Sequence, residues 1–324
     1  MNCCNRPQRI PGNFFRKSGK CLTMLLLALL GAWCVGVSCF VWHFSGAVSV
    51  LFGCVLLVIW LSAWSVCRAV WMLAFAELCV LFSFLLLTPA QRFRNEKWNV
   101  ECRKVPMVSR LADGRIAIGN IRDFHYRSVE DFDVRYRDDV FDPAQLSSMD
   151  IAFSYWLPCE AAAHTLLQFN FSDGKKLAVS FEPRVPQGFK GGSFWLGVYR
   201  QYGQMMLFAS PEDIFGVRVN HRKEDFYLYR TTISGKQLKN IFCNIVRQAE
   251  ALSHRDEFYN SLTRNCTTGL AAAFREVPEL HQFDLRWILN GYCDRLLFEK
   301  GVLETTENER FASLKARSLC RRQI

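Results

Sequence analysis

A 68-residue apolar tract near the N-terminus is the feature that most constrains this chain. Between Cys21 and Thr88 the only charged residues are Arg68 and Glu77, whereas the sequence after residue 90 has the charge density of a globular domain. A helix that crosses a bilayer needs about 20 apolar residues, so the tract can hold three spans with short turns. It is also too long for a cleaved signal peptide. The composition therefore excludes a wholly soluble enzyme, a disordered chain, a coiled coil and a repeat array.

Basic residues near the ends of this tract indicate its orientation. The first 20 residues contain five lysines and arginines and no acidic residue, which places them in the cytoplasm by the positive-inside rule. The first turn has no basic residue and the second has Arg68, as expected for an outside loop followed by an inside loop. We therefore expect the chain after residue 89 to lie outside the cytoplasm, although Arg92, Arg94 and Lys97 favour the opposite side. The three spans are predicted near residues 21–42, 46–65 and 69–88.

The sequence after the tract has the pattern of an α+β domain. His164–Phe171 and Leu177–Glu182 are strand-like and flank a Ser-Asp-Gly turn, which predicts a β-hairpin. Ser234 is a natural N-cap for a helix whose apolar residues recur at helical spacing up to Leu252. A second helix is predicted from Cys266 to Phe274. Further strands are predicted at Ile116–Ile118, Asp123–Arg127, Met205–Ala209, Phe215–Asn220 and Phe226–Tyr229.

These patterns divide the chain into five parts and predict an antiparallel sheet with helices gathered late in the sequence. The parts are a basic cytoplasmic N-terminus (1–20), three transmembrane helices (21–88), a linker (89–115), the α+β domain (116–304) and a polar, mobile tail (305–324).

Cys266 differs from the other cysteines in its local sequence. Asn265 directly before it is a natural N-cap, so the thiol would lie in the first turn of a helix, where the local field lowers the pKa of a thiol. A thiol nucleophile needs a histidine that takes its proton, and His164 at the head of the hairpin could serve. The histidine precedes the cysteine, the reverse of classical papain and the order of its circularly permuted branch. A disulfide or a buried thiol would explain Cys266 equally well without chemistry.

Motifs that are individually weak follow one another in order between residues 118 and 270. They are Asn120–Arg127, Ala163–Leu167 with Phe171–Gly174, Ser180–Arg184, Tyr199–Gly203, Val217–Arg222 with Tyr227–Arg230, and Tyr259–Thr268. Together they resemble the Lnb N-terminal periplasmic domain family of bacterial membrane proteins. The resemblance implies a permuted papain-like (NlpC/P60-like) domain in the periplasm, anchored to the inner membrane and centred on His164 and Cys266. The family's namesake is linked with N-acylation of lipoproteins, but no further membrane segment is predicted here after residue 91, so the substrate need not be the same.

Other polar residues near these motifs are candidates for the same site. Glu182 shares a strand face with Ser180 and could orient His164 as the third member of a triad. A salt bridge from Glu182 to Arg184 or Arg230 would explain this residue equally well. Asn265 could donate to an oxyanion or act as the N-cap alone. The residues predicted to contact substrate are Asn265, Ser180, Arg184, Arg200 and Tyr202.

The sequence thus predicts a membrane-anchored periplasmic thiol enzyme, with Cys266 as nucleophile and His164 as general base. The reaction would be acyl transfer or amide hydrolysis on a lipoprotein, lipid or peptide, without a metal or cofactor. The alternative is a non-catalytic envelope module that binds peptide, glycan or lipid through the same groove. Nucleic acid is disfavoured as a partner because the basic residues are dispersed.

Overall fold

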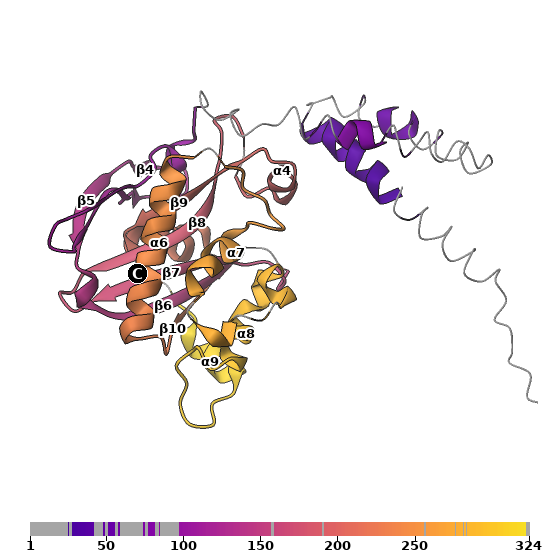
Figure 1. Cartoon of the computed structure of the whole chain (residues 1–324). Coiled ribbons are helices and arrows are strands. Elements are labelled where there is room, and N and C mark those ends of the chain that lie inside the picture. Colours follow the sequence, from indigo (N-terminus) through magenta and orange to yellow (C-terminus); the bar gives the residue numbers. More distant parts are fainter. Residues whose placement is uncertain are drawn as a thin grey trace, which may run out of the picture. The chain divides into compact units, whose positions relative to one another are not determined.

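The structure is a computed structural model of the whole chain (Figure 1). It describes residues 97–321 apart from 157, 158, 190, 256, 276, 281 and 283, together with short helical pieces between residues 25 and 84. The chain divides into two compact units, Met1–Pro89 and Ala90–Ile324. This boundary coincides with the predicted change from apolar tract to globular domain.

The described pieces of the first unit are helical and pack on one another. The rings of Trp33 and Phe84 meet edge to face with centroids 5.6 Å apart. Glu77 is buried, and one of its carboxylate oxygens lies 3.1 Å from the position that a Cβ on Gly31 would occupy. The carboxylate therefore packs against a position that has no side chain. Among these pieces no helix has both the length and the apolar character that a membrane crossing requires, and most of the three predicted spans lies outside the described residues.

An eight-stranded, mostly antiparallel sheet forms the centre of the second unit. Its strands are β1 (Met107–Arg110), β2 (Ile116–Arg122), β5 (Tyr136–Phe141), β6 (Leu146–Tyr155), β7 (His164–Phe171), β8 (Lys176–Arg184), β9 (Gly203–Ala209) and β10 (Asp225–Arg230). The strand order is β1-β2-β9-β8-β7-β6-β10, with β5 also paired to β2. The β2–β9 pair is parallel. A separate ribbon joins β3 (His125–Tyr126) to β4 (Phe132–Asp133). The predicted α+β class and the β7–β8 hairpin are confirmed.

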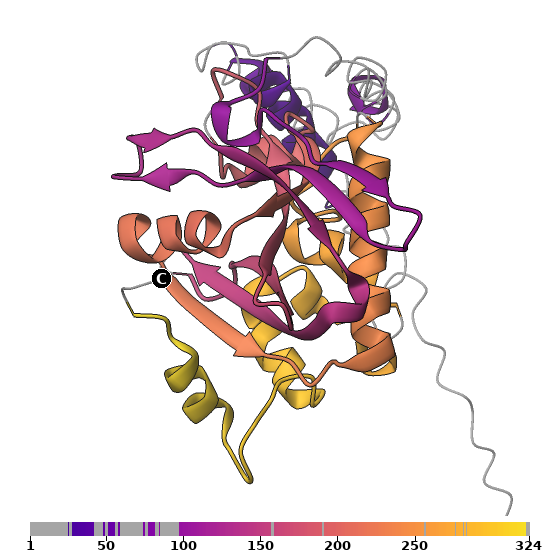
Figure 2. The same cartoon turned by 90° about the vertical axis from the view of Figure 1, so that its left-hand side faces the viewer.

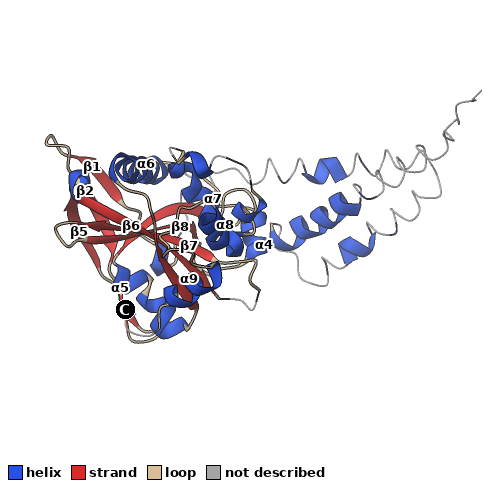
Figure 3. Cartoon of the chain, turned by 90° about the horizontal axis from the view of Figure 1, so that it is seen from below, coloured by secondary structure: helices blue, strands red, loops and turns tan. Residues whose placement is uncertain are grey.

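Helices cover both faces of this sheet (Figures 2 and 3). The α-helices are α4 (Phe194–Val198), α5 (Pro211–Ile214), α6 (Gly235–Ser253), α7 (Cys266–Ala271), α8 (Cys293–Glu299) and α9 (Phe311–Ser318). The shorter turns are η2 (Val100–Cys102), η3 (Pro143–Gln145), the π-helical η4 (Val217–Arg222), η5 (Ala272–Phe274), η6 (Pro278–Leu280), η7 (Leu285–Trp287) and η8 (Asn290–Tyr292). Helices α6 and α7 lie on one face, and α5 and η4 lie on the other.

The alternation of side chains along the central hairpin determines what each face of the sheet contacts. On β7, Phe169 and Phe171 point to α6 and meet the ring of Phe242 with centroids 5.1 and 5.7 Å away. On β8, Phe181 faces α7, where Gly269 leaves room for its ring. Because the side-chain period of a strand is two, Ser180 and Glu182 on either side of Phe181 face away from α7.

Two predicted elements are wrong. Phe215–Asn220 is not a strand, because the chain continues from α5 into the π-helical η4. Valines at 217 and 219 alternate with polar residues and imitate a strand, whereas Ser210 caps α5 and Pro211 begins it. The predicted linker at 89–115 contains β1, which pairs with β2.

The segment after Glu304 is not a mobile tail. Its helix α9 buries Leu314, and the backbone N–H of Cys320 donates to the Phe226 carbonyl of β10 at 2.8 Å. The Nζ of Lys315 lies 3.3 Å from the buried carboxylate of Asp294 and 4.7 Å from the centroid of the Tyr155 ring. These contacts hold the C-terminal segment against the edge of the sheet.

Candidate active site

The start of α7 places Cys266. The Asn265 side chain accepts hydrogen bonds from the backbone N–H groups of Thr267 and Thr268, both at 2.9 Å. In return the Thr268 hydroxyl accepts from the Asn265 N–H at 2.9 Å, which completes a capping box. The predicted N-cap is therefore present, and Cys266 is the first residue of the helix.

The β7–β8 hairpin places the imidazole. His164 is the first residue of β7, and register puts Ser180 and Glu182 of β8 beside it. The His164 Nε2 atom lies 2.7 Å from the Ser180 Oγ and 2.9 Å from the Glu182 Oε1. The side chains of His164 and Glu182 are 12% and 19% exposed. Both polar partners contact Nε2, so this nitrogen fixes the orientation of the ring.

The charges of this cluster shift the pKa values of the thiol and the imidazole in opposite directions. Burial acts to lower the pKa of His164, but the charges of Glu182 and Cys266 and hydrogen bonds to both raise it to about 9. Burial acts to raise the pKa of Cys266, but the charge of His164 and a hydrogen bond to it bring the value below the ordinary 9.0. The site therefore favours a thiolate beside an imidazolium.

Glu182 has an arginine partner that the sequence patterns did not identify. Arg218 of η4 brings a terminal guanidinium nitrogen to 3.5 Å from the Glu182 Oε1. Burial acts to raise the pKa of the Glu182 carboxyl, but His164 and Arg218 hold it well below its usual range. The same guanidinium donates to the Ile214 carbonyl at 2.7 Å and lies near Glu224. A π-helical turn is a common feature of functional sites, and here it delivers the arginine that accompanies the carboxylate.

The two arginines considered as alternative partners of Glu182 lie elsewhere. Arg184 donates to the backbone carbonyls of Cys102 and Arg103, at 3.1 and 2.8 Å. Arg230 pairs with Asp150 on the outer part of the sheet, with an N–O distance of 2.5 Å. Neither contact involves Glu182.

Two of the residues predicted to contact substrate have described partners away from Cys266. The guanidinium of Arg200 lies over the ring of Phe258 at 5.8 Å. Tyr202 is buried, and its hydroxyl accepts a hydrogen bond from the Ser193 N–H at 3.3 Å. The role of Arg184, Arg200 and Tyr202 in substrate binding stays a prediction.

Asn290 is part of the cluster and was missed by sequence reasoning. Its Nδ2 atom lies 3.2 Å from the Cys266 sulfur, and its Oδ1 accepts from the Ala163 N–H at 3.0 Å. The only local signal is the Asn-Gly pair at 290–291, which is typical of a turn. Nothing in that dipeptide relates it to a cysteine 24 residues earlier.

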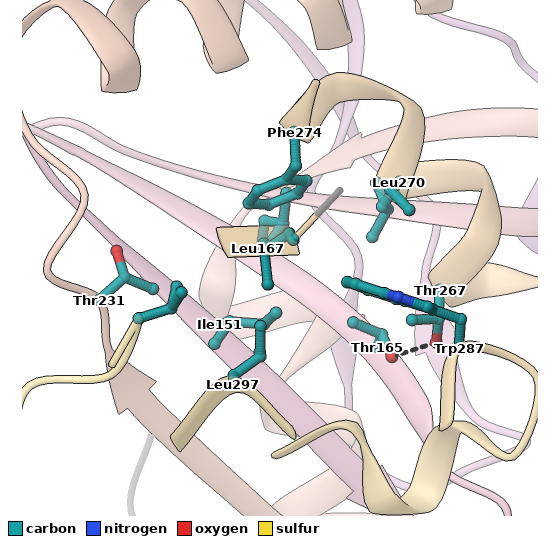
Figure 4. Close-up of a pocket in the computed structure, with 12 residues that line it drawn as sticks. Ile151, Thr165, Leu167, Thr231, Thr267, Leu270, Phe274, Trp287 and Leu297 are labelled. Carbon is teal, nitrogen blue, oxygen red and sulfur yellow. Dashed lines mark hydrogen bonds between the residues drawn. The ribbon is translucent and has the colours of Figure 1, made fainter. Parts of the chain in front are cut away.

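An apolar cavity lies between β7 and α7, next along both elements from His164 and Cys266 (Figure 4). Thr165 and Thr267, which directly follow His164 and Cys266, line it and share a hydrogen bond. The rest of the wall includes Leu167, Leu270, Phe274 and Trp287.

The described cysteines of the second unit are all free thiols, Cys266 among them. They are Cys102, Cys159, Cys243, Cys266, Cys293 and Cys320. A disulfide, one of the explanations of Cys266 that needs no chemistry, is thus absent among the described residues.

Comparison with known proteins identifies one family. The model of the Lnb N-terminal periplasmic domain matches residues 132–291, a range that contains His164, Glu182, Cys266 and Asn290. Neither the curated proteins nor the solved structures include a significant match to the chain. The family resemblance predicted from the ordered motifs is therefore confirmed, and the greater part of the second unit is similar to the Lnb N-terminal periplasmic domain.

Proposed function

We propose that the protein is a membrane-anchored periplasmic enzyme that transfers acyl groups through a thioester on Cys266, within a permuted papain-like domain. The observation that carries this proposal is the arrangement around His164, which has Glu182 and Ser180 on one ring nitrogen and interacts with the Cys266 thiol. Thiol nucleophiles are activated by such an oriented base. The match to a periplasmic domain family supports the compartment.

The reaction would proceed in two steps. The Cys266 thiolate attacks the acyl carbon, an S–C bond forms, and the carbonyl π pair moves to oxygen. Collapse of this intermediate breaks the bond to the leaving group, which takes a proton from the His164 imidazolium. An amine or water then attacks the thioester while His164 accepts its proton, and the thiolate is regenerated. Glu182 stabilises the imidazolium throughout and keeps the ring oriented.

The surroundings of the thiol favour an acyl donor that is resident in or near a membrane. The cavity lined by Thr165 and Thr267, the residues that follow His164 and Cys266, has an apolar wall. The 21–88 tract would hold the domain at the bilayer as three spans with a cytoplasmic N-terminus. An ester of a lipid or lipoprotein, or the amide of an envelope peptide, would meet the thiol there. Release to an amine would make the enzyme an acyltransferase, and release to water would make it a hydrolase.

The test is acylation of the full-length protein in detergent by a p-nitrophenyl acyl ester, followed by intact mass. We expect one acyl group on Cys266 that hydroxylamine removes. His164→Gln should abolish it, because the thiol then loses its base. Cys159→Ser is the matched control, since this thiol is exposed and should not be required.

A cellular measurement distinguishes the enzyme from a binding module. Cys266→Ser keeps the shape of the side chain but replaces the thiol by an alcohol of much higher pKa. At matched membrane abundance it should not complement a deletion strain. Full complementation would overturn the catalytic proposal and favour the binding module.

A further inference from the structure

We propose that Asn290 supplies the oxyanion site of the Cys266 reaction. Its carboxamide N–H would donate a hydrogen bond to the thiolate in the resting enzyme and then to the oxygen of the tetrahedral intermediate. This inference rests on the proposed acyl transfer and adds to it a residue outside the Cys-His-Glu group.

The orientation of the Asn290 amide is fixed by its other contact. The Ala163 backbone N–H can only donate, and it lies 3.0 Å from Oδ1. The NH₂ group must therefore face the Cys266 sulfur, 3.2 Å away. The sulfur accepts a hydrogen bond in this arrangement, and amide donors stabilise it most when it is a thiolate.

The backbone around Asn290 is held in place as firmly as its side chain. The Gly291 N–H donates to the Ala161 carbonyl at 3.1 Å, and the Gly291 carbonyl accepts from the Tyr155 hydroxyl at 2.7 Å. A Cβ at residue 291 would overlap the carbonyl oxygen of Glu160, so only glycine permits this approach. A donor fixed in advance needs no reorganisation when charge develops on the substrate.

Several other donors at the start of α7 already have partners. The Asn265 amide, the residue predicted to donate to an oxyanion, points its NH₂ group to the Ser261 carbonyl at 3.4 Å. The backbone N–H groups of Thr267 and Thr268 bond to the Asn265 side chain.

The chemistry places the oxyanion within reach of Asn290. When the sulfur bonds to the acyl carbon, the negative charge moves from sulfur to an oxygen two bonds away. A fixed donor 3.2 Å from the sulfur therefore lies near the place where that oxygen develops its charge. When the intermediate collapses, the oxygen regains its double bond and the leaving group departs with the His164 proton.

The test compares two reactions of the same thiol. Alkylation by iodoacetamide displaces iodide and forms no oxyanion, whereas acylation by a p-nitrophenyl ester does. In Asn290→Ala the acylation rate of fully ionised Cys266 should fall on the order of 10²–10³-fold, the usual loss for one oxyanion donor. Alkylation at the same high pH should be unchanged, and its apparent pKa should rise because the thiolate has lost a donor.

Two further variants control for structure. Asn290→Asp keeps an acceptor for the Ala163 N–H but has no donor, so it should lose acylation as Asn290→Ala does. Asn244→Ala is the matched control, because Asn244 donates to the Ala273 carbonyl at 3.1 Å in a purely structural contact. Its acylation rate should equal that of the wild type.

Each adverse outcome would refute one part of the proposal. Equal loss of acylation and high-pH alkylation in the Asn290 variants would show a structural role and refute the oxyanion site. An unchanged acylation rate would refute it as well. If the wild type forms no acyl-enzyme, the acyl-transfer proposal fails. The alkylation profile then decides whether Asn290 holds the thiolate, and an unchanged profile would refute that too.

Discussion

A 2.6 Å hydrogen bond joins the hydroxyls of Thr165 and Thr267, the residues that directly follow His164 and Cys266. It connects β7 to α7 at the point where the two reactive side chains meet. Both threonines are buried and line the apolar cavity. The distance between base and nucleophile is thus set partly by a bond in which neither reactive residue takes part.

Removal of one of these hydroxyls should lower the free energy of unfolding more than removal of both. Thr267→Val leaves the Thr165 hydroxyl buried without its partner, which should lower the free energy of unfolding by about 1–3 kcal/mol. The Thr165→Val/Thr267→Val double variant places two methyl groups beside an apolar wall and should recover part of that loss. Thermal unfolding of the purified full-length protein measures both, and strictly additive losses would contradict the expectation.

Removal of the Glu182 charge should narrow the pH range of the reaction. Its carboxylate helps to raise the pKa of His164 to about 9, so in Glu182→Gln the imidazolium should lose its proton at lower pH. Because less of the imidazole is then protonated at a given pH, the thiolate is stabilised less and the pKa of Cys266 should rise. The acid limb of Cys266 alkylation should then move to higher pH and the alkaline limb of acylation to lower pH. Glu299→Gln, on the surface with Arg286 and Arg295, is the control.

Lys315 should contribute to stability through the buried Asp294. The lysine is the cationic partner of this carboxylate, which also accepts from the Tyr229 hydroxyl and the Arg295 N–H. Lys315→Ala should lower the free energy of unfolding by about 1–3 kcal/mol, because it leaves a buried charge less compensated. The half-buried Lys300, whose Nζ lies 3.5 Å from the Gln282 side chain, provides a control whose replacement by alanine should change little. Equal melting temperatures for the two variants would show that the contact is unimportant.

The orientation of the chain can be tested by fusions. Alkaline phosphatase is active only outside the cytoplasm, so a fusion after Ile324 should be active and a fusion after Ser65 inactive. This expectation follows from the basic residues that flank the three predicted spans and their short loops. An inactive fusion after Ile324 at normal abundance would remove the periplasmic assignment and the acyl-transfer proposal with it.

Elements with strong local signals were predictable from the sequence. The β7–β8 hairpin has alternating apolar residues and a Ser-Asp-Gly turn, and its observed ends lie within two residues of the predicted ones. The N-cap at Asn265 and the apolar face of α6 are equally local. His164 and Cys266 were found because each begins such an element.

Features that depend on tertiary contacts were not predictable. Strand β6 is buried on both faces over much of its length, so it lacks the alternation that reveals a half-exposed strand. Arg218 reaches Glu182 only because η4 is a π-helical turn, and its valines imitate a strand. Asn290 joins the site through contacts with residues 161–163, which no pattern near residue 290 encodes.

The attachment of the C-terminal segment to β10 has a consequence for how molecules meet one another. Strand β10 is last in the sheet, and a bare edge strand offers its backbone to any other extended chain. Here the bridge between Tyr227 and Leu319, with the Cys320 N–H bonded to Phe226, occupies part of that edge. Truncation before Phe311 would uncover the strand and make the protein prone to aggregate. The segment that contains α9 and residues 319–320 should therefore prevent aggregation as well as stabilise the fold.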